Sequence, residues 1–214
     1  MTRRLLQTLR TRLAPIGLLV SLVAASTAAI AAAPTAPAAG AARAPELASD
    51  SVYQLAATLT DQDGRAGRLD ERLGHPVLVT MFYTSCQFVC PMIVEALRDT
   101  EAKLGAEERK HVSVLMVSID PEHDSVAVLR RTADERGLDT SRWTLARTDA
   151  TTVRKLAAVL GVQYRALPDG EFNHTTAVIL LGADGRIVAR TTRLGSADPS
   201  FVKRVKAAIQ ASAL

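Results

Sequence analysis

Residues 77–91 read VLVTMFYTSCQFVCP, an apolar run that leads directly into two cysteines and a proline. The run from Val77 to Tyr83 is continuous and partly β-branched, which is typical of a strand buried on both faces. Pro91 suits the first position of a helix, where its missing N–H needs no partner. The stretch therefore predicts a central strand that turns into a helix, with Cys86 and Cys90 at the turn.

Strand and helix patterns alternate on either side of this stretch. Further strands are predicted at residues 53–59, 112–119, 143–146, 176–181 and 186–191, the last two as a hairpin around Ala183-Asp184-Gly185. Further helices are predicted near Val126, from a cap at Asp149 or Thr148 to an end at Gly161, and from Asp198-Pro199 to the end of the chain. This order predicts an α/β fold with a mainly parallel central sheet, an antiparallel hairpin at its edge and flanking helices. In such sheets, functional residues gather at the carboxyl ends of the strands.

The charge distribution argues against a nucleic-acid partner. The formal net charge is +4, and the four excess charges lie in the first twelve residues, at Arg3, Arg4, Arg10 and Arg12. The remaining basic side chains equal the 22 acidic ones in number. The folded part therefore has no excess of positive charge for phosphate contacts.

The N-terminus has the layout of an export signal. The basic start leads into an apolar stretch at residues 16–33 that ends in small residues. We expect residues 1–33 to be a cleaved signal peptide or an uncleaved membrane anchor, since the stretch has about the shortest length that can span a bilayer. Residues 34–49 are rich in Ala and Pro and predict a disordered tether. The folded domain is then residues 50–214, exported to the periplasm, soluble or anchored to the inner membrane, and monomeric.

Cys86 and Cys90 are the only cysteines in the chain. A structural disulfide is one interpretation for an exported protein, but a bridge closing so short a loop removes little unfolded-state entropy. Amide groups and the helix dipole favour a thiolate at a strand-to-helix turn, so we expect reactive or metal-binding thiols. Two thiolates form a soft donor set that suits Cu(I). The spacing is one residue wider than the usual C-x-x-C redox pair, which leaves dithiol chemistry open.

A third donor could come from one of four histidines. We expect His75 and His111 to be surface residues, and His123 to be a secondary contact at the functional end of the sheet. His174 lies just before residues 176–181, in a segment that would pass beside the cysteine turn in a thioredoxin-like sheet. By position alone it is either a solvated loop histidine or a metal ligand.

Two aspartates follow the strand that ends at Ile119 and should face the same end of the sheet as the cysteines. Asp120 and Asp124 are candidates for carboxylates that adjust the properties of a thiol or a metal ligand without binding the metal themselves. The alternative for Asp124 is an N-cap of the helix that begins near Val126.

The chain resembles the Sco/SenC family in three blocks: Phe82-Tyr83-Thr84-Ser85-Cys86-x-x-x-Cys90-Pro91, Val117-Ser118-Ile119-Asp120-Pro121-x-x-Asp124, and His174 before an apolar strand and Ala183-Asp184-Gly185. The resemblance runs from about Tyr53 onward. It implies a thioredoxin fold, an N-terminal strand or hairpin extension, and copper, as Cu(I) or Cu(II), bound by Cys86, Cys90 and His174. It also implies delivery of that copper to a membrane oxidase subunit, at the dinuclear copper centre of cytochrome c oxidase, or to another copper protein.

The resemblance leaves more than one function open. Family members also include thiol–disulfide reductants, so the alternative is an oxidoreductase that reduces the cysteines of a copper-receiving partner. The family usually has Pro after the first cysteine and often Asp before the histidine, where this chain has Gln87 and Asn173. A peroxidase of the peroxiredoxin kind is disfavoured because Thr84 precedes Cys86 by two residues rather than three. A binding module without chemistry would leave the placement of the cysteines unexplained.

Overall fold

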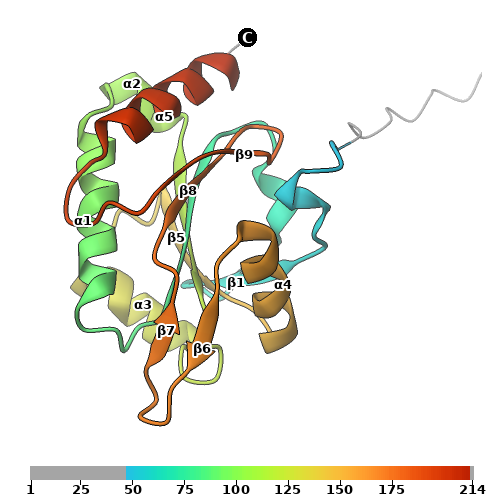
Figure 1. The fold of residues 1–214 in the computed structure, drawn as a ribbon, viewed down its shortest axis with the longest axis vertical. Coiled ribbons are helices and arrows are strands. Elements are labelled where there is room, and N and C mark those ends of the chain that lie inside the picture. The colour runs from blue at the N-terminus through green and yellow to red at the C-terminus, as the bar shows by residue number, and fades with distance from the viewer. Residues whose placement is uncertain (1–46, 213–214) are drawn as a thin grey trace, which may run out of the picture. The chain divides into compact units, whose positions relative to one another are not determined.

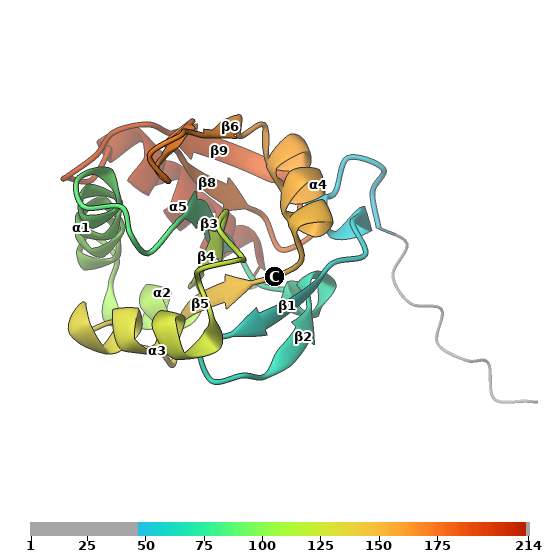
Figure 2. The same ribbon diagram turned by 90° about the horizontal axis from the view of Figure 1, so that it is seen from below.

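The fold is built on a seven-stranded mixed sheet with helices on both faces (Figure 1). The structure, a computed structural model, describes residues 47–212. The strand order is β2-β1-β5-β4-β3-β8-β9, and a separate two-stranded sheet is formed by β6 and β7. Helices α1 and α3 lie on one side of the large sheet and α4 on the other (Figure 2). The thioredoxin-like α/β fold that the sequence predicts is confirmed, but the sheet is mixed rather than mainly parallel, because only the β3–β4 and β4–β5 pairs are parallel.

The strands are β1 (Thr58–Asp61), β2 (Ala66–Arg68), β3 (Val77–Phe82), β4 (Ser113–Ser118), β5 (Trp143–Arg147), β6 (Tyr164–Ala166), β7 (Phe172–His174), β8 (Val178–Leu181) and β9 (Ile187–Thr191). The helices are α1 (Val89–Ala102), α2 (Ala106–Lys110), α3 (Val126–Glu135), α4 (Ala150–Leu160) and α5 (Pro199–Ser212), with 3₁₀ turns η1 (Val52–Gln54) and η2 (Leu69–Arg72).

Strands β3, β4 and β5 form the parallel centre of the sheet. All six residues of β3 are buried, as its uninterrupted apolar sequence predicts. The β8–β9 hairpin adds an antiparallel edge beside β3, and the β1–β2 hairpin adds the other edge beside β5. Because β3 and β4 run the same way, the loops after both strands lie at one edge of the sheet.

Helix ends follow local sequence signals. The Asp149 carboxylate accepts hydrogen bonds from the N–H groups of Thr151 and Thr152, at 2.9 and 3.0 Å, and so caps α4. Gly161 ends the same helix with φ of 63°, a left-handed conformation that suits glycine. Asp149 as the cap and Gly161 as the end are both as the sequence predicts.

Several predicted boundaries are wrong. Residues 52–54 form the turn η1 rather than part of a strand, because the Ser51 hydroxyl accepts the Tyr53 N–H at 3.2 Å. Helix α1 begins at Val89, so Pro91 is its third residue and not its first. The β6–β7 hairpin was not predicted, because its strands have only three residues each. The Asp169-Gly170 pair at its tip is the signal that could have revealed it.

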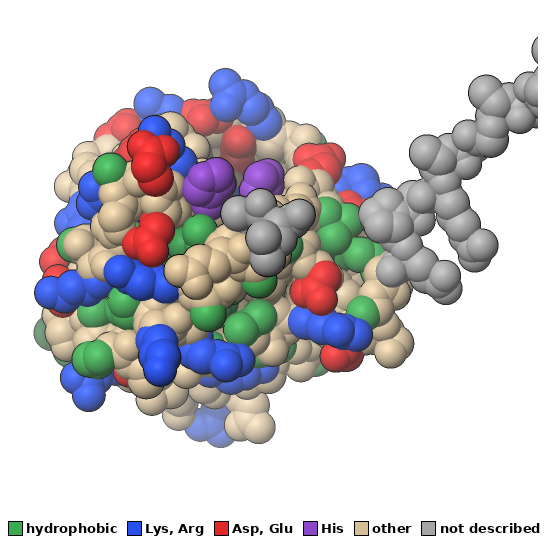
Figure 3. Space-filling view, turned by 90° about the horizontal axis from the view of Figure 1, so that it is seen from above, with side chains coloured by type: hydrophobic (Ala, Val, Ile, Leu, Met, Phe, Trp, Pro, Cys, Tyr) green, Lys and Arg blue, Asp and Glu red, His purple; other side chains and the backbone are tan. Residues whose placement is uncertain are grey.

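The predicted N-terminal segments lie mostly outside the described residues. Residues 1–33 and most of the tether at 34–49 belong to this part, so the signal peptide, the anchor and the tether stay predictions. Within residues 47–212, no helix combines the length and the apolar character needed to span a bilayer. On the face seen in Figure 3, basic and acidic side chains are interspersed with uncharged ones.

A buried carboxylate ties α1 to the central sheet. Glu101, only 6% exposed, accepts a hydrogen bond from the Trp143 indole at 2.9 Å and pairs with Arg142 at 2.5 Å. Both donors come from the start of β5, so the C-terminal end of α1 is held against that strand. A buried charge is tolerated where such partners satisfy it.

Gly185, in the β8–β9 turn, should be the glycine most sensitive to substitution. Its φ is 79°, and an added Cβ would lie 2.3 Å from Cδ2 of Tyr53 and 2.5 Å from the Ser51 hydroxyl. Gly185→Ala should lower the free energy of unfolding by about 3 kcal/mol, since a left-handed backbone and an overpacked contact each cost about 1–2 kcal/mol. Gly137→Ala is the control, because φ is 57° there and a Cβ meets nothing within 4 Å. Urea unfolding of both variants measures the difference, and equal losses would contradict the close packing on Gly185.

Candidate metal centre

The two cysteines lie where the sequence predicts, in the connection from β3 to α1. Cys86 precedes the helix, and Cys90 is in its first turn. Both thiols are free, with exposed fractions of 5% and 1%. The Cys90 N–H donates to Cys86 Sγ at 3.3 Å, which places the first sulfur over the amino end of the helix. Figure 2 looks onto this edge of the sheet.

The two thiols differ in acidity. Burial raises the pKa of Cys86, but hydrogen bonds from the Cys90 thiol and from the amides of residues 88–90 outweigh it, so this pKa lies below its usual value. Burial raises the pKa of Cys90 to about 12. Cys86 is therefore the thiol that more readily becomes a thiolate, as the predicted helix-terminus effect requires.

Asp124 fixes the residues that precede Cys86. Its buried carboxylate accepts hydrogen bonds from the Ser118 hydroxyl at 2.5 Å, from the Thr84 N–H at 3.2 Å and from the Thr84 hydroxyl. The N-cap of α3 is Ser125, so the alternative of Asp124 as a cap is wrong. Burial raises the pKa of Asp124, although these hydrogen bonds act against the shift. The carboxylate joins the ends of β3 and β4 behind the cysteine loop.

Asp120 lies at the same edge but contacts a histidine rather than the cysteine loop. Its carboxylate oxygens are both 2.9 Å from Nδ1 of His123, and its N–H donates to the Ser118 hydroxyl at 2.9 Å. The hydrogen bond and charge of Asp120 raise the pKa of His123. His123 is exposed, and a role for it or for Asp120 at the metal stays a prediction.

His174 is the last residue of β7 rather than part of a loop. Its Nδ1 is 3.2 Å from the Thr175 carbonyl oxygen, and burial lowers the pKa of its imidazole. A lowered pKa favours the neutral ring, which is the form that ligates a metal. The ring lies edge-on to Tyr83, with centroids 5.8 Å apart.

The structure brings the two cysteines together but does not bring His174 into the same cluster. Within residues 47–212, no group of three or more His, Cys, Asp or Glu side chains could hold a metal ion as placed. Tyr83 contacts both the cysteine loop and the imidazole. Its backbone carbonyl accepts a hydrogen bond from the Cys86 N–H at 3.3 Å, and its ring contacts His174. The three-ligand set stays a prediction that requires a further approach of His174.

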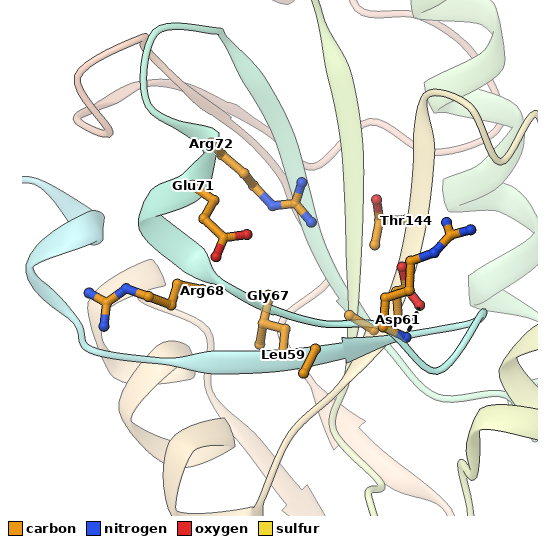
Figure 4. A pocket seen from close by; sticks show the side chains of 10 residues that line it. Leu59, Asp61, Gly67, Arg68, Glu71, Arg72 and Thr144 are labelled. Carbon is orange, nitrogen blue, oxygen red and sulfur yellow. Dashed lines mark hydrogen bonds between the residues drawn. The ribbon is translucent and has the colours of Figure 1, made fainter.

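The two remaining histidines and the hollow beside β2 and η2 lie away from this edge. His75 and His111 are exposed, as predicted. They precede β3 and β4, so they lie at the opposite end of those strands from the cysteine loop. A hollow of about 400 Å³ beside β2 and η2 includes Glu71 and Arg72 in its lining and none of the predicted ligands (Figure 4).

Sequence reasoning missed three features of the site. Tyr83 and Thr84 appeared in the family blocks without a role, yet they contact His174 and Asp124. Phe88, between the two cysteines, is 84% exposed, an unusual position for so large an apolar side chain. Its place in the C-x-x-x-C loop was the available signal.

Comparison with known proteins assigns the chain to a family. The family model described as SCO1/SenC matches residues 48–210. The chain belongs to the SCO1/SenC family. Its relatives include the SCO1 protein homolog of Bacillus subtilis, 27% identical over 61% of this chain and 69% of that protein. The mitochondrial SCO2 homolog of Bos taurus is 28% identical over 73% of this chain and 60% of its own length.

A solved relative has the same fold. The structure of Bradyrhizobium japonicum ScoI with copper bound is 25% identical to this SCO1/SenC protein, with a TM-score of 0.56 over 72% of this chain and 96% of that one. The match to the bovine relative covers less than two thirds of that protein.

Cys86 should react faster than Cys90 in the reduced, metal-free protein. At pH 7, iodoacetamide should modify Cys86 at least about tenfold faster, because its lower pKa leaves more thiolate. The Cys90 rate should stay low until the pH approaches its pKa of about 12. Mass spectrometry of peptides over time measures both rates, with the urea-unfolded chain as the control in which the rates converge. Faster modification of Cys90 in the folded protein would contradict the assignment.

Asp124→Ala should destabilise the protein and loosen the cysteine loop. The substitution leaves the Ser118 and Thr84 donors without their acceptor, which should lower the free energy of unfolding by about 2–4 kcal/mol. Modification of Cys90 by iodoacetamide should then accelerate. Asp134→Ala is the matched control, because that carboxylate is exposed and pairs with an exposed Arg130 at 3.2 Å, so its loss should cost less than about 1 kcal/mol. Equal effects of the two substitutions would rule out the role of Asp124.

Proposed function

We propose that this protein binds copper through Cys86, Cys90 and His174 and passes it to a copper-receiving protein, with the dinuclear copper centre of cytochrome c oxidase as the recipient. The observation that carries the proposal is the pair of free, buried thiols at the amino end of α1 in a SCO1/SenC fold. The copper-bound structure of a relative that is 25% identical supports it.

The donor set fits copper by its chemistry. Two sulfurs and one imidazole are soft to intermediate ligands, which copper prefers over the oxygen ligands of magnesium or calcium. The lowered pKa of Cys86 favours the thiolate, and the lowered pKa of His174 favours the neutral imidazole. Asp124 holds the loop that carries Cys86, through Thr84.

The two departures from the family pattern leave all three proposed ligands in place. Gln87 is exposed, and its side-chain amide donates to the Ser85 carbonyl at 3.2 Å within the loop. Asn173 is exposed and pairs with Arg165 in the β6–β7 hairpin. An uncharged residue beside His174 adds no negative charge to the copper site, so we expect less stabilisation of Cu(II) than an aspartate would give.

The proposed location and assembly rest on the N-terminal sequence. The basic and apolar start of the chain supports export to the periplasm, with either a soluble domain or one attached to the inner membrane. A monomer suffices for the function, because one chain carries all three proposed ligands.

A thiol–disulfide reductant is the second candidate, and the unequal pKa values of the thiols favour it. A lowered pKa suits Cys86 as the attacking thiolate, and Cys90 is placed to displace the partner afterwards. In that reaction the two thiols of this chain become a disulfide, while a disulfide of the partner becomes two thiols. The copper-binding cysteines of the recipient would be the substrate.

His174→Ala separates the two candidates. If the protein carries copper, the wild type should bind one copper per chain, and the variant should lose about 100-fold or more in Cu(II) affinity, beyond the effect of a supporting residue. Metal analysis and the thiolate-to-copper absorption band measure this, with His111→Ala as the control at an exposed histidine. Full rescue of an oxidase-assembly defect by His174→Ala, together with no rescue by Cys86→Ser, would overturn the copper carrier and favour the reductant.

A further inference from the structure

The β6–β7 hairpin carries His174 but does not belong to the main sheet. Its strands pair only with each other, with Tyr164 opposite His174 and Ala166 opposite Phe172. Its position relative to the cysteine loop therefore depends on side-chain contacts and not on a shared strand ladder.

Tyr83 supplies the side-chain contacts that join this hairpin to the cysteine loop. Its hydroxyl donates to Glu171 Oε2 at 2.6 Å and accepts the Phe172 N–H at 3.5 Å. Its ring packs against that of Phe172, with centroids 5.1 Å apart. Tyr83 itself is 4% exposed and follows directly after β3, so it is a fixed point against which the hairpin rests.

The same tyrosine contacts both parts of the proposed copper site. Its ring meets the His174 imidazole edge-on at 5.8 Å, and its backbone carbonyl accepts a hydrogen bond from the Cys86 N–H at 3.3 Å. With the hydrogen bond to Glu171 in place, His174 and the two thiols do not form one cluster among residues 47–212. A shift of the hairpin along Tyr83 would move His174 relative to the sulfurs and would stretch the bond to Glu171.

We propose that Tyr83 is a positioning residue for His174: its hydrogen bond to Glu171 holds the hairpin with the imidazole apart from the thiols, and opening of this bond allows the imidazole to close on copper. The inference rests on the proposed copper function. Tyr83 is not itself a ligand in this scheme, and it acts through the position of the hairpin. The scheme assigns a role to Glu171, an exposed residue with no expected function.

Hydrogen exchange of the full-length, copper-free protein tests the hydrogen bond by itself. Tyr83→Phe and Glu171→Ala should each speed exchange of the amides in residues 163–175 by about tenfold, the factor expected for one hydrogen bond to a carboxylate. The double variant should add little to either single variant, because both remove the same bond. Tyr164→Phe and Glu122→Ala are the matched controls and should change exchange less than twofold. Tyr164 is on the hairpin without a bond to Glu171, and Glu122 is an exposed acid at the same edge.

Copper binding tests the consequence for His174. Cu(II), added as a simple salt to the reduced protein, should develop the His174-dependent part of the thiolate-to-copper band about tenfold faster in Tyr83→Phe and Glu171→Ala, since the closing conformation is more populated. Adding His174→Ala to either variant should remove the acceleration. A merely structural tyrosine would instead slow binding.

The outcomes separate this inference from the proposed function. Unchanged hairpin exchange in Glu171→Ala, a surface variant that should fold normally, would overturn the role of the bond. Faster exchange over the whole chain in Tyr83→Phe, with no effect in Glu171→Ala, would also overturn it and assign Tyr83 to packing. Failure of the wild type to bind copper would overturn the proposed function, while the exchange experiment would still decide whether the bond holds the hairpin.

Discussion

The cysteine loop of the candidate site is positioned by strand β3. This strand is buried along its whole length and pairs with β4 on one side and β8 on the other. A strand held on both edges and both faces cannot shift its register without exposing apolar side chains, so its carboxyl end is a rigid starting point. Tyr83, Thr84 and Cys86 follow this end directly.

A buried carboxylate holds the loop that follows β3 in a defined conformation. Asp124 comes from the segment after β4, and it joins Ser118 at the end of that strand to Thr84 at the end of β3. The loop between Thr84 and α1 is therefore held at both ends, by this carboxylate and by the first turn of the helix. The result is an asymmetric dithiol, in which amide groups stabilise the Cys86 thiolate while burial keeps Cys90 protonated.

The third proposed ligand is held much less tightly than the first two. His174 lies on a short hairpin outside the main sheet, and Tyr83 links that hairpin to the cysteine loop through Glu171 and Phe172. A dithiol on a rigid loop beside an imidazole on a separate hairpin would suit the proposed uptake and release of a metal ion. The same dithiol, without the imidazole, has the two unequal thiols that a thiol–disulfide reductant needs. Both proposed functions are therefore compatible with this arrangement of residues.

The amino-acid sequence alone determined the features that depend on near neighbours. The apolar run before Tyr83 predicted the central strand, Asp149 and Gly161 marked the ends of α4, and the two cysteines were placed at the correct turn because strand and helix signals flank them. The family blocks added the SCO1/SenC assignment. Only the tertiary structure could reveal the contacts between residues far apart in the chain. Asp124 meets Thr84 across 40 residues, and Tyr83 meets Glu171 across 88. Periodicity and capping report on interactions within a few residues, whereas such contacts exist only once the strands have paired and the loops that follow them lie at one edge.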